Sequence, residues 1–442
     1  MRRLYFPLLF AVSCMADTSY TRDIRPILQK QCQGCHQPAS KASDLDLTTF
    51  AGFAKGGRRG VAFTANAADS LVVKYISGAA QPRMPIGGAP LTADQIQLFK
   101  DWIATGAKDD TIVAVSTGPS VYMQPPVVTA LAFSPDGQHI AVSGNREILI
   151  HKADGSAIVA RLQGNAERIL SLTFSADGSM LIAGGGTPAR SGEIQVWDAK
   201  TFKQIRAVKV TEDTVFGASI SADGSKIAVG GADNTVRMIE TATGKELFKI
   251  GNHENWVLGT LFTLDARRVI SIGRDRAAKL TDANTGAFLE NINLLRSELA
   301  AVARHPSKEI IVIGGEERYP YIYQVDRGRN IRIADDANQL KKLDRQNGLI
   351  FSLAWSPDAK SIAVAGGGPE VNLYDAESGK LTASCKGHSA GIYVVAFSPD
   401  SNRIATGGFD GQIRLYDAAS GTLANTFSPV PLSATTSKGA AQ

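Results

Sequence analysis

Short apolar strands alternate with turns along most of the chain after residue 125. In a typical unit an apolar run such as Val128–Phe133 precedes a Pro-Asp-Gly turn, and two further short apolar runs follow. The turn has a physical cause, because proline presets φ, aspartate bonds its own backbone and glycine supplies a positive φ. Short apolar runs separated by such turns predict an all-β architecture.

This unit recurs seven times. The turn motif starts at Phe133, Phe174, Ile220, Phe262, Ala303, Trp355 and Phe397, at intervals of 41, 46, 42, 41, 52 and 42 residues. A period of about 40–45 residues is that of four-stranded propeller blades. Five copies are strong, whereas the fourth and fifth are weak, and the longest interval places an insertion near residues 327–347. We therefore predict a seven-bladed β-propeller over residues 127–428.

The segment before residue 110 has the periodicity of helices instead. Residues 20–28 place apolar side chains at i, i+3 and i+4, which predicts a short amphipathic helix. Residues 92–95 have the Thr-x-x-Gln pattern of a capping box, and an apolar stripe follows them as far as Ile103. We predict a small all-α domain over residues 17–110.

Composition narrows the classes of function. Hydrophobic residues make up 44% and charged residues 20%, which is typical of a globular protein. The formal net charge is 47 − 42 = +5, and it is too small and too dispersed for a nucleic-acid-binding surface. Four cysteines in 442 residues exclude a disulfide scaffold. Residues 111–126 are predicted as a linker and residues 429–442 as a disordered tail.

The N-terminus has the pattern of an export signal. Two arginines precede an apolar run, residues 4–13, which is too short to span a bilayer. Cleavage after Ala16 would remove residues 1–16 as a signal peptide and release a soluble periplasmic protein. Alternatively, residues 11–14 resemble a lipobox, and Cys14 would then carry a lipid that anchors the protein to the membrane. We favour the soluble form, because a lipobox usually has leucine where this chain has alanine.

The sequence Cys32-Gln33-Gly34-Cys35-His36 has the C-x-x-C-H pattern of covalent c-type haem attachment. Two thiols three positions apart can reach the two vinyl groups on one edge of a porphyrin, and His36 can then turn its imidazole to the iron. A zinc ribbon would need a second C-x-x-C pair, which Cys14 and Cys385 do not form. We predict one covalent haem c on Cys32 and Cys35, with His36 as the proximal iron ligand.

A distal iron ligand is expected between this motif and the last helix. Met84 is the only methionine between His36 and Thr92, and it lies in a loop rich in proline and glycine, residues 81–90. A thioether suits low-spin haem iron and raises its reduction potential. A lone methionine often fills a gap in a core instead, but a polar loop does not favour that role. We predict that Met84 is the distal ligand.

Further short motifs follow the C-x-x-C-H sequence in a fixed order. They are Asp44-Leu45-Asp46-Leu47, Asp69-Ser70-Leu71-Val72, Tyr75, Arg83-Met84-Pro85, Leu91-Thr92 and Trp102-Ile103. In this order residues 32–109 resemble the planctomycete-type cytochrome c domain. The resemblance implies a class I cytochrome c fold, haem c on the two cysteines, and iron held between His36 and Met84. Residues 40–43 depart from the family because they lack the glycines often found after the haem motif.

The repeats carry a second resemblance. The third strand of a unit ends in an aromatic residue and aspartate, as in Trp197-Asp198, Tyr374-Asp375 and Tyr416-Asp417. These units resemble Trp-Asp (WD) repeats, in which a Gly-His dipeptide bonds to a turn aspartate within a blade. His388 with Asp410 fits that pattern, and His253 with Asp275 is a looser match. We therefore expect structural roles for His253 and His388.

The combination favours an exported electron carrier rather than an enzyme. One haem would exchange single electrons with a redox partner protein, and the propeller would be a scaffold for protein docking. A first alternative is a haem oxidoreductase with a substrate or second cofactor in the propeller channel, although no cluster of His, Asp and Glu at the blade mouths supports it. A second alternative is an interaction protein whose haem is a sensor, which would favour an open or weakly held sixth site. No nucleic-acid partner is expected, and membrane attachment only if Cys14 is lipidated.

Overall fold

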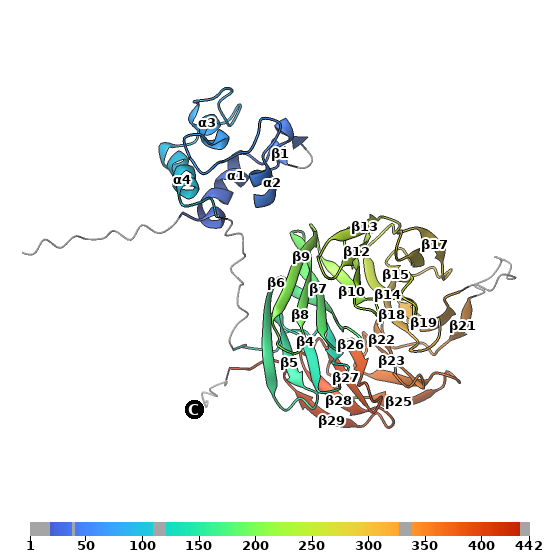
Figure 1. The fold of residues 1–442 in the computed structure, drawn as a ribbon. Coiled ribbons are helices and arrows are strands. Elements are labelled where there is room, and N and C mark those ends of the chain that lie inside the picture. The colour runs from blue at the N-terminus through green and yellow to red at the C-terminus, as the bar shows by residue number, and fades with distance from the viewer. Residues whose placement is uncertain (1–17, 38–39, 109–120, 327–337, 434–442) are drawn as a thin grey trace, which may run out of the picture. The chain divides into compact units, whose positions relative to one another are not determined.

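The computed structural model describes residues 18–37, 40–108, 121–326 and 338–433 of the chain. The chain divides into two compact units, with the division between Val115 and Ser116 (Figure 1). Several predicted features lie wholly or partly outside the described residues: the signal peptide, Ala16 and Cys14, most of the linker, much of the insertion near residues 327–347, and the end of the tail.

The N-terminal unit is mainly helical. Its elements are a π-helical turn (Tyr20–Ile24), α1 (Arg25–Gln31), β1 (His36–Gln37), β2 (Ser40–Lys41), a 3-10 turn (Ala42–Asp44), α2 (Phe50–Lys55), α3 (Leu71–Ser77) and α4 (Ala93–Ala104). The capping box of α4 is confirmed, because Gln95 N donates to Thr92 Oγ1 at 3.2 Å and Thr92 N donates to Gln95 Oε1 at 3.0 Å. The β1–β2 hairpin is a departure from the predicted all-α domain.

Aromatic side chains hold this unit together. Trp102 of α4 stacks on Phe53 of α2 with ring centroids 5.9 Å apart, and Tyr20 lies 5.6 Å from the same indole. All three residues are almost completely buried. The indole nitrogen of Trp102 donates to the Lys108 carbonyl at 3.1 Å, which satisfies its polar atom. The predicted terminal helices therefore pack against one core, together with α2.

The C-terminal unit is built from four-stranded antiparallel blades. Blades one and two contain β3 (Leu131–Phe133), β4 (His139–Ser143), β5 (Asn145–Lys152), β6 (Ile158–Phe174), β7 (Met180–Thr187), β8 (Ser191–Asp198) and β9 (Gln204–Thr211). Blade three contains β10 (Val215–Ile220), β11 (Lys226–Gly231), β12 (Val236–Glu240) and β13 (Glu246–Ile250). Blade four contains β14 (Val257–Phe262), β15 (Arg268–Gly273), β16 (Ala278–Asp282) and β17 (Phe288–Asn291).

The remaining blades repeat the same order. Blade five contains β18 (Leu299–Arg304), β19 (Ile310–Gly315), β20 (Tyr321–Gln324) and β21 (Gln339–Lys342). Blade six contains β22 (Ile350–Trp355), β23 (Ser361–Gly366), β24 (Val371–Asp375) and β25 (Leu381–Cys385). Blade seven contains β26 (Ile392–Phe397), β27 (Arg403–Gly408), β28 (Ile413–Asp417) and β29 (Leu423–Phe427). Within each blade, every strand pairs with the next one along the chain.

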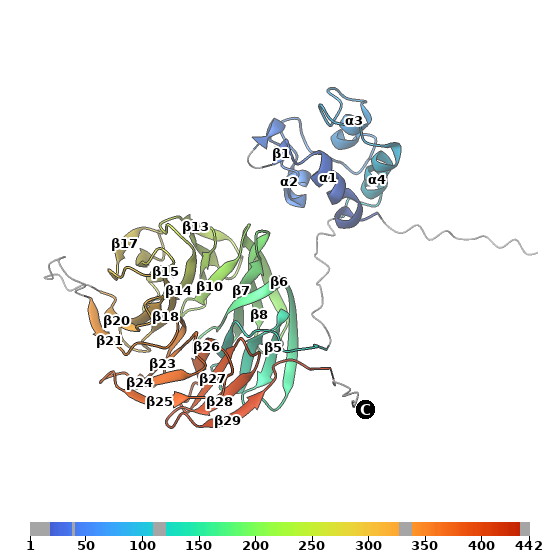
Figure 2. The ribbon, with the colours of Figure 1, turned by 180° about the vertical axis from the view of Figure 1, so that it is seen from behind.

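The blades close into a ring, as Figures 1 and 2 show. The first strand of each blade contacts the first strand of the next, and β26 of blade seven contacts β3 of blade one. Val128 N donates to the Gly408 carbonyl at 3.0 Å across this junction. Blades one and two share β6, whose first half pairs with β5 and whose second half pairs with β7, so these two blades form one seven-stranded sheet.

The turns between the first two strands of the blades have the predicted chemistry. In blade one Asp136 Oδ1 accepts hydrogen bonds from Ser134 Oγ at 2.5 Å and from Gln138 N at 3.0 Å. Gly137 has φ +69°, in the region that glycine favours. Equivalent hydroxyl bonds, from Ser175 and Ser221, lower the pKa of Asp177 and of Asp223 to about 2.

A terminal strap, formed by residues 121–123 and 429–433, fastens both ends of this unit to blade one. Tyr122 N donates to the Pro431 carbonyl at 2.8 Å, and Ser433 N donates to the Tyr122 carbonyl at 2.8 Å. Tyr122 and Val430 are buried together. The folded unit is therefore longer at both ends than the predicted residues 127–428. The prediction of a disordered tail was wrong for residues 429–433, because their backbone and side chains find partners in the strap.

Candidate functional site

A cavity of about 370 Å³ lies in the N-terminal unit. The residues predicted to hold haem, Cys32, Cys35, His36 and Met84, all line it. Its other walls are mainly apolar and include Leu28, Leu45, Leu47, Phe53, Ala62 and Val72. The fold thus brings two thiols, one imidazole and one thioether together around an apolar space, although Met84 is 48 residues from His36 in sequence.

The two cysteines lie in a tight turn that follows α1. Cys32 N donates to the Leu28 carbonyl at 2.9 Å, and His36 N donates to the Cys32 carbonyl at 3.2 Å. Cys35 is exposed, whereas Cys32 is partly buried. Burial, and secondarily the neighbouring Cys35, raise the pKa of the Cys32 thiol to about 11. A raised pKa is the opposite of what a reactive redox cysteine needs.

His36 is buried and has a defined ring orientation. Its Nδ1 lies 3.0 Å from the carbonyl oxygen of Ala42. Because a carbonyl oxygen only accepts, Nδ1 donates in this bond, and Nε2 keeps a lone pair for a metal ion. The adjoining Ser43 and Asp44 have φ of +56° and +55°. Ser43, in the segment noted for its missing glycines, and the next residue, Asp44, therefore both lie in the left-handed region.

Met84 is held by the end of α3. The helix ends at Gly78, which has φ +87° and reverses the chain direction. Ala80 N then donates to the Lys74 carbonyl at 2.9 Å, and Met84 N donates to the Tyr75 carbonyl at 3.0 Å. The Met84 side chain is partly buried and packs against the core cluster of the N-terminal unit.

The structure adds cavity-lining residues that the motif analysis did not assign. Arg59 is the one charged residue among the described residues that line the cavity, and its Nη1 donates to the Tyr75 hydroxyl at 2.6 Å. Gln31 also lines the cavity, and its buried Oε1 has no hydrogen-bond partner among the described residues. Two adjacent arginines between glycines, Gly57-Arg58-Arg59-Gly60, are the sequence signal that could have identified this wall.

This donor set fits haem c. Imidazole and thioether are ligands of low-spin haem iron, and two thiols can form thioethers with its vinyl groups. A guanidinium at the cavity matches the geometry of a carboxylate, which haem carries on its propionates. The unpartnered Oε1 of Gln31 belongs to a further polar side chain that lines the cavity.

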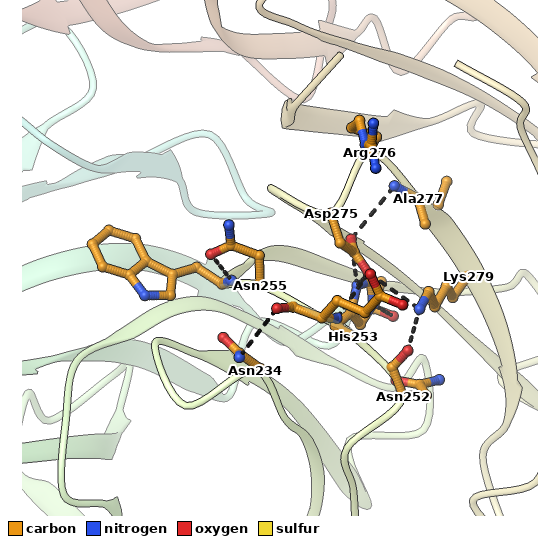
Figure 3. A network of polar contacts seen from close by, with 12 residues as sticks. Asn234, Asn252, His253, Asn255, Asp275, Arg276, Ala277 and Lys279 are labelled. Carbon is orange, nitrogen blue, oxygen red and sulfur yellow. Dashed lines mark hydrogen bonds and ion pairs between the residues drawn. The ribbon is translucent and has the colours of Figure 1, made fainter. Parts of the chain in front are cut away.

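His253 belongs to a polar network in blade four, shown in Figure 3. Its Nδ1 lies 2.9 Å from Asp275 Oδ1 and its Nε2 lies 2.7 Å from Ser271 Oγ. Lys279 forms an ion pair with the same aspartate at 3.1 Å. Both ring nitrogens of this buried histidine are thus engaged within one blade. The predicted structural role of His253 is confirmed.

His388 has the same arrangement in blade seven. Its Nδ1 lies 3.0 Å from Asp410 Oδ2, its Nε2 lies 2.7 Å from Thr406 Oγ1, and Arg414 replaces the lysine beside the aspartate. The predicted structural role of His388 is confirmed as well. Burial raises the pKa of the nearby Cys385 thiol to about 12, which is unlike a nucleophilic cysteine.

Within the described ranges no group of three or more His, Cys, Asp and Glu side chains is placed to hold a metal ion. No helix in the part of the chain that the structure describes is long and apolar enough to cross a membrane.

Two family models match the chain, one in the N-terminal unit and one in the C-terminal unit. The family model described as Planctomycete cytochrome C matches residues 32–85. The WD domain, G-beta repeat, matches residues 121–152, 156–198, 202–240 and 379–417. These four matches correspond to blades one, two, three and seven. Of blade six, which the sequence motifs place among the strong copies, only β25 falls within a match, although the blade has the same four strands.

Curated relatives are similar to part of the chain. The transcription factor unc-37 of Caenorhabditis elegans is 29% identical over 202 residues, 45% of this chain and 31% of that protein. The APC/C activator protein CDC20 of Saccharomyces cerevisiae is 26% identical over 265 residues, 56% of this chain and 41% of that protein. This chain thus spans less than half the length of these relatives. The chain thus contains a segment that matches the planctomycete cytochrome C model, followed by segments that match the WD-repeat model, in the order that its motifs predict.

Proposed function

We propose that the protein is an exported c-type cytochrome that carries one covalent haem and transfers single electrons. One observation carries the proposal: Cys32, Cys35, His36 and Met84 line the same apolar cavity. The match to the cytochrome family over residues 32–85 supports it independently of the geometry. The sensor alternative would favour an open or weakly held sixth site, and the presence of Met84 at the cavity argues against an open one.

Each cavity residue has a role in this proposal. Cys32 and Cys35 would form the thioethers, and the bond from His36 Nδ1 to the Ala42 carbonyl would leave Nε2 to hold the iron. Met84 would supply a thioether sulfur, which favours the ferrous form, and Arg59 would pair with a propionate. The apolar walls exclude water from the group. Bound haem supplies a one-electron couple.

In this proposal the propeller is the part of the protein on which a partner protein docks. WD repeats form a rigid ring with many exposed loops, and such loops are where binding surfaces are commonly placed. The occupant would be a redox partner protein. Export to the periplasm belongs to the same proposal, since covalent haem attachment suits an exported chain, and the mass of the mature N-terminus tests it. A chain that starts at Asp17 supports the soluble form, whereas a diacylglyceryl group on Cys14 would support the lipoprotein.

Potentiometric titration of the full chain tests electron transfer. The protein is made in a host that matures c-type cytochromes, and its visible spectrum is followed as the potential is lowered and raised. We expect one reversible transition with a slope of one electron. A Cys385→Ala variant is the matched control, because this cysteine is buried in the propeller, and it should titrate like the wild type. A haem spectrum that does not respond to potential would refute the proposed function.

A further inference from the structure

Arg59 lies outside the loop that carries Met84, and its side chain contacts both that loop and α3. We infer that Arg59 is a positioning residue, which holds the Met84 loop (residues 78–85) against α3 through Tyr75. The inference rests on the proposed function, because it concerns how firmly Met84 is kept at the iron of the proposed haem.

Tyr75 contacts Met84 and Arg59 through different atoms. Its backbone carbonyl accepts a hydrogen bond from Met84 N at 3.0 Å. Its hydroxyl accepts one from Arg59 Nη1 at 2.6 Å, and the guanidinium carbon lies 5.2 Å from the centre of its ring. A movement of Tyr75 would therefore move the atom that holds Met84, so restraint of the phenol by Arg59 restrains the methionine.

Arg59 also reaches the loop directly. The same Nη1 lies 3.5 Å from the Gln81 carbonyl, at the outer limit of a hydrogen bond. The arginine itself lies in a short turn in which Gly57 N donates to Gly60 O, and Gly60 N donates to Gly57 O, both at 3.0 Å. Arg59 thus joins a closed turn to a loop more than twenty residues later. Because it both lines the cavity and is exposed, it lies at the cavity mouth.

The firmness with which the loop is held affects how easily an outside ligand replaces Met84 at the iron. A sulfur ligand on a loose loop must be ordered each time it binds again, and that loss of conformational entropy favours an outside ligand. A loop that is already fixed avoids this loss. The strength with which a small outside ligand displaces Met84 therefore reports how firmly the loop is held.

Arg58 is a natural control next to the proposed residue. Its guanidinium pairs with Asp44 at 3.0 Å on the exposed surface, and Arg58 is not among the residues that line the cavity. Loss of its charge changes the net charge by the same amount as loss of Arg59. It removes no contact to Tyr75 or to the Met84 loop among the interactions described above.

Imidazole binding to the ferric full-length protein is the test. Wild type, Arg59→Gln, Arg59→Lys, Tyr75→Phe and Arg58→Gln are compared after their covalent haem content has been measured. We expect Arg59→Gln and Tyr75→Phe to bind imidazole about threefold to tenfold more tightly than wild type, the range for one partly exposed hydrogen bond. Arg59→Lys should fall between them and wild type, and Arg58→Gln should match wild type. Hydrogen exchange of residues 78–85 should be faster in Arg59→Gln and Tyr75→Phe.

Other outcomes overturn the inference. If only Arg59→Gln changes, while Arg59→Lys and Tyr75→Phe equal wild type, the effect is that of a charge near the iron and not of positioning. Equal affinities in all variants would also exclude it. If Arg59→Gln does not accumulate as folded protein, Tyr75→Phe and Arg59→Lys decide by the same criteria. A wild-type protein without covalent haem would instead refute the proposed function itself, which the initial haem measurement detects separately.

Discussion

Replacement of Tyr122 by phenylalanine removes one hydroxyl group from the contact between the terminal strap and blade one. That hydroxyl donates to Glu147 Oε1 at 2.6 Å. The Glu147 side chain is completely buried, and its other bonds come from Arg161, at 2.8 Å from Nε and 2.6 Å from Nη2. Burial, and then Glu147 itself, raise the pKa of Tyr122, so the phenol stays protonated as a donor. The phenylalanine ring can occupy the same site.

The magnitude follows from the kind of bond that is lost. A hydrogen bond to a charged group contributes about 1.5–3 kcal/mol. Arg161 continues to neutralise Glu147 in the variant, which reduces the loss to about 1–2 kcal/mol of unfolding free energy, well below the cost of leaving a buried charge unpaired. With a urea dependence of about 3 kcal/mol per M for a unit of this size, the midpoint should fall by roughly 0.3–0.7 M.

Urea unfolding of the full chain, followed through the β-sheet signal in circular dichroism, is the assay. Tyr319→Phe is the matched control, because the described residues provide no hydrogen-bond partner for the Tyr319 hydroxyl, and its ring contact with Lys342 would remain. We expect the control to keep the wild-type midpoint. If Tyr122→Phe also keeps it, the hydrogen bond to Glu147 does not stabilise the propeller, and our account of the strap is refuted.

Three further predictions concern the proposed site and the pH range. The Met84→Ala variant should keep its covalent haem, lose the weak far-red sulfur-to-iron absorption and have a lower reduction potential. If the absorption band and the potential are unchanged, another group is the ligand. Ser43→Gly should stabilise the N-terminal unit by about 0.5–1 kcal/mol and so raise its thermal midpoint, because φ +56° costs serine more than glycine. A lower midpoint would argue against that conformation. Burial lowers the pKa of His388 from 6.5, so the propeller should lose stability as pH falls through about 6.5, where the unfolded chain gains a proton that the folded one resists. The Ser221 hydroxyl holds the pKa of Asp223 at about 2, so a second loss should follow between pH 4 and 2, and a thermal midpoint that is constant from pH 7 to 2 would contradict both assignments.

The local elements were predictable where one short segment determines its own structure. The Asp136 turn and the Thr92 capping box form from residues within a few positions of one another, so their sequences contain the whole interaction. The repeat interval also gave the number of blades. Shared β6 was not predicted, because its continuity depends on two blades pairing with the same strand. The strap was missed for a similar reason, since Tyr122 and Pro431 lie more than 300 residues apart.

In the site, too, the residues of one short motif were predictable, whereas contacts between distant segments were not. Cys32, Cys35 and His36 form one short motif, and their position in one turn follows from it. The shape of the cavity depends on α2, α3 and the Gly57–Gly60 turn, which no motif specified. Arg59 was missed because its relation to Tyr75 exists only after the intervening chain has folded. The left-handed backbone at Ser43 and Asp44 was not predicted, although Ser43 lies in the segment noted for its missing glycines.

The most direct test of the central claim is whether haem stays bonded to the denatured polypeptide. Full-length protein from a host that matures c-type cytochromes is unfolded, extracted with acid and organic solvent, and weighed by mass spectrometry. We predict a mass increased by one haem, located on the peptide that contains Cys32 and Cys35, and no such increase when both cysteines are replaced by alanine. Complete extraction of the haem from the wild-type protein would contradict the account.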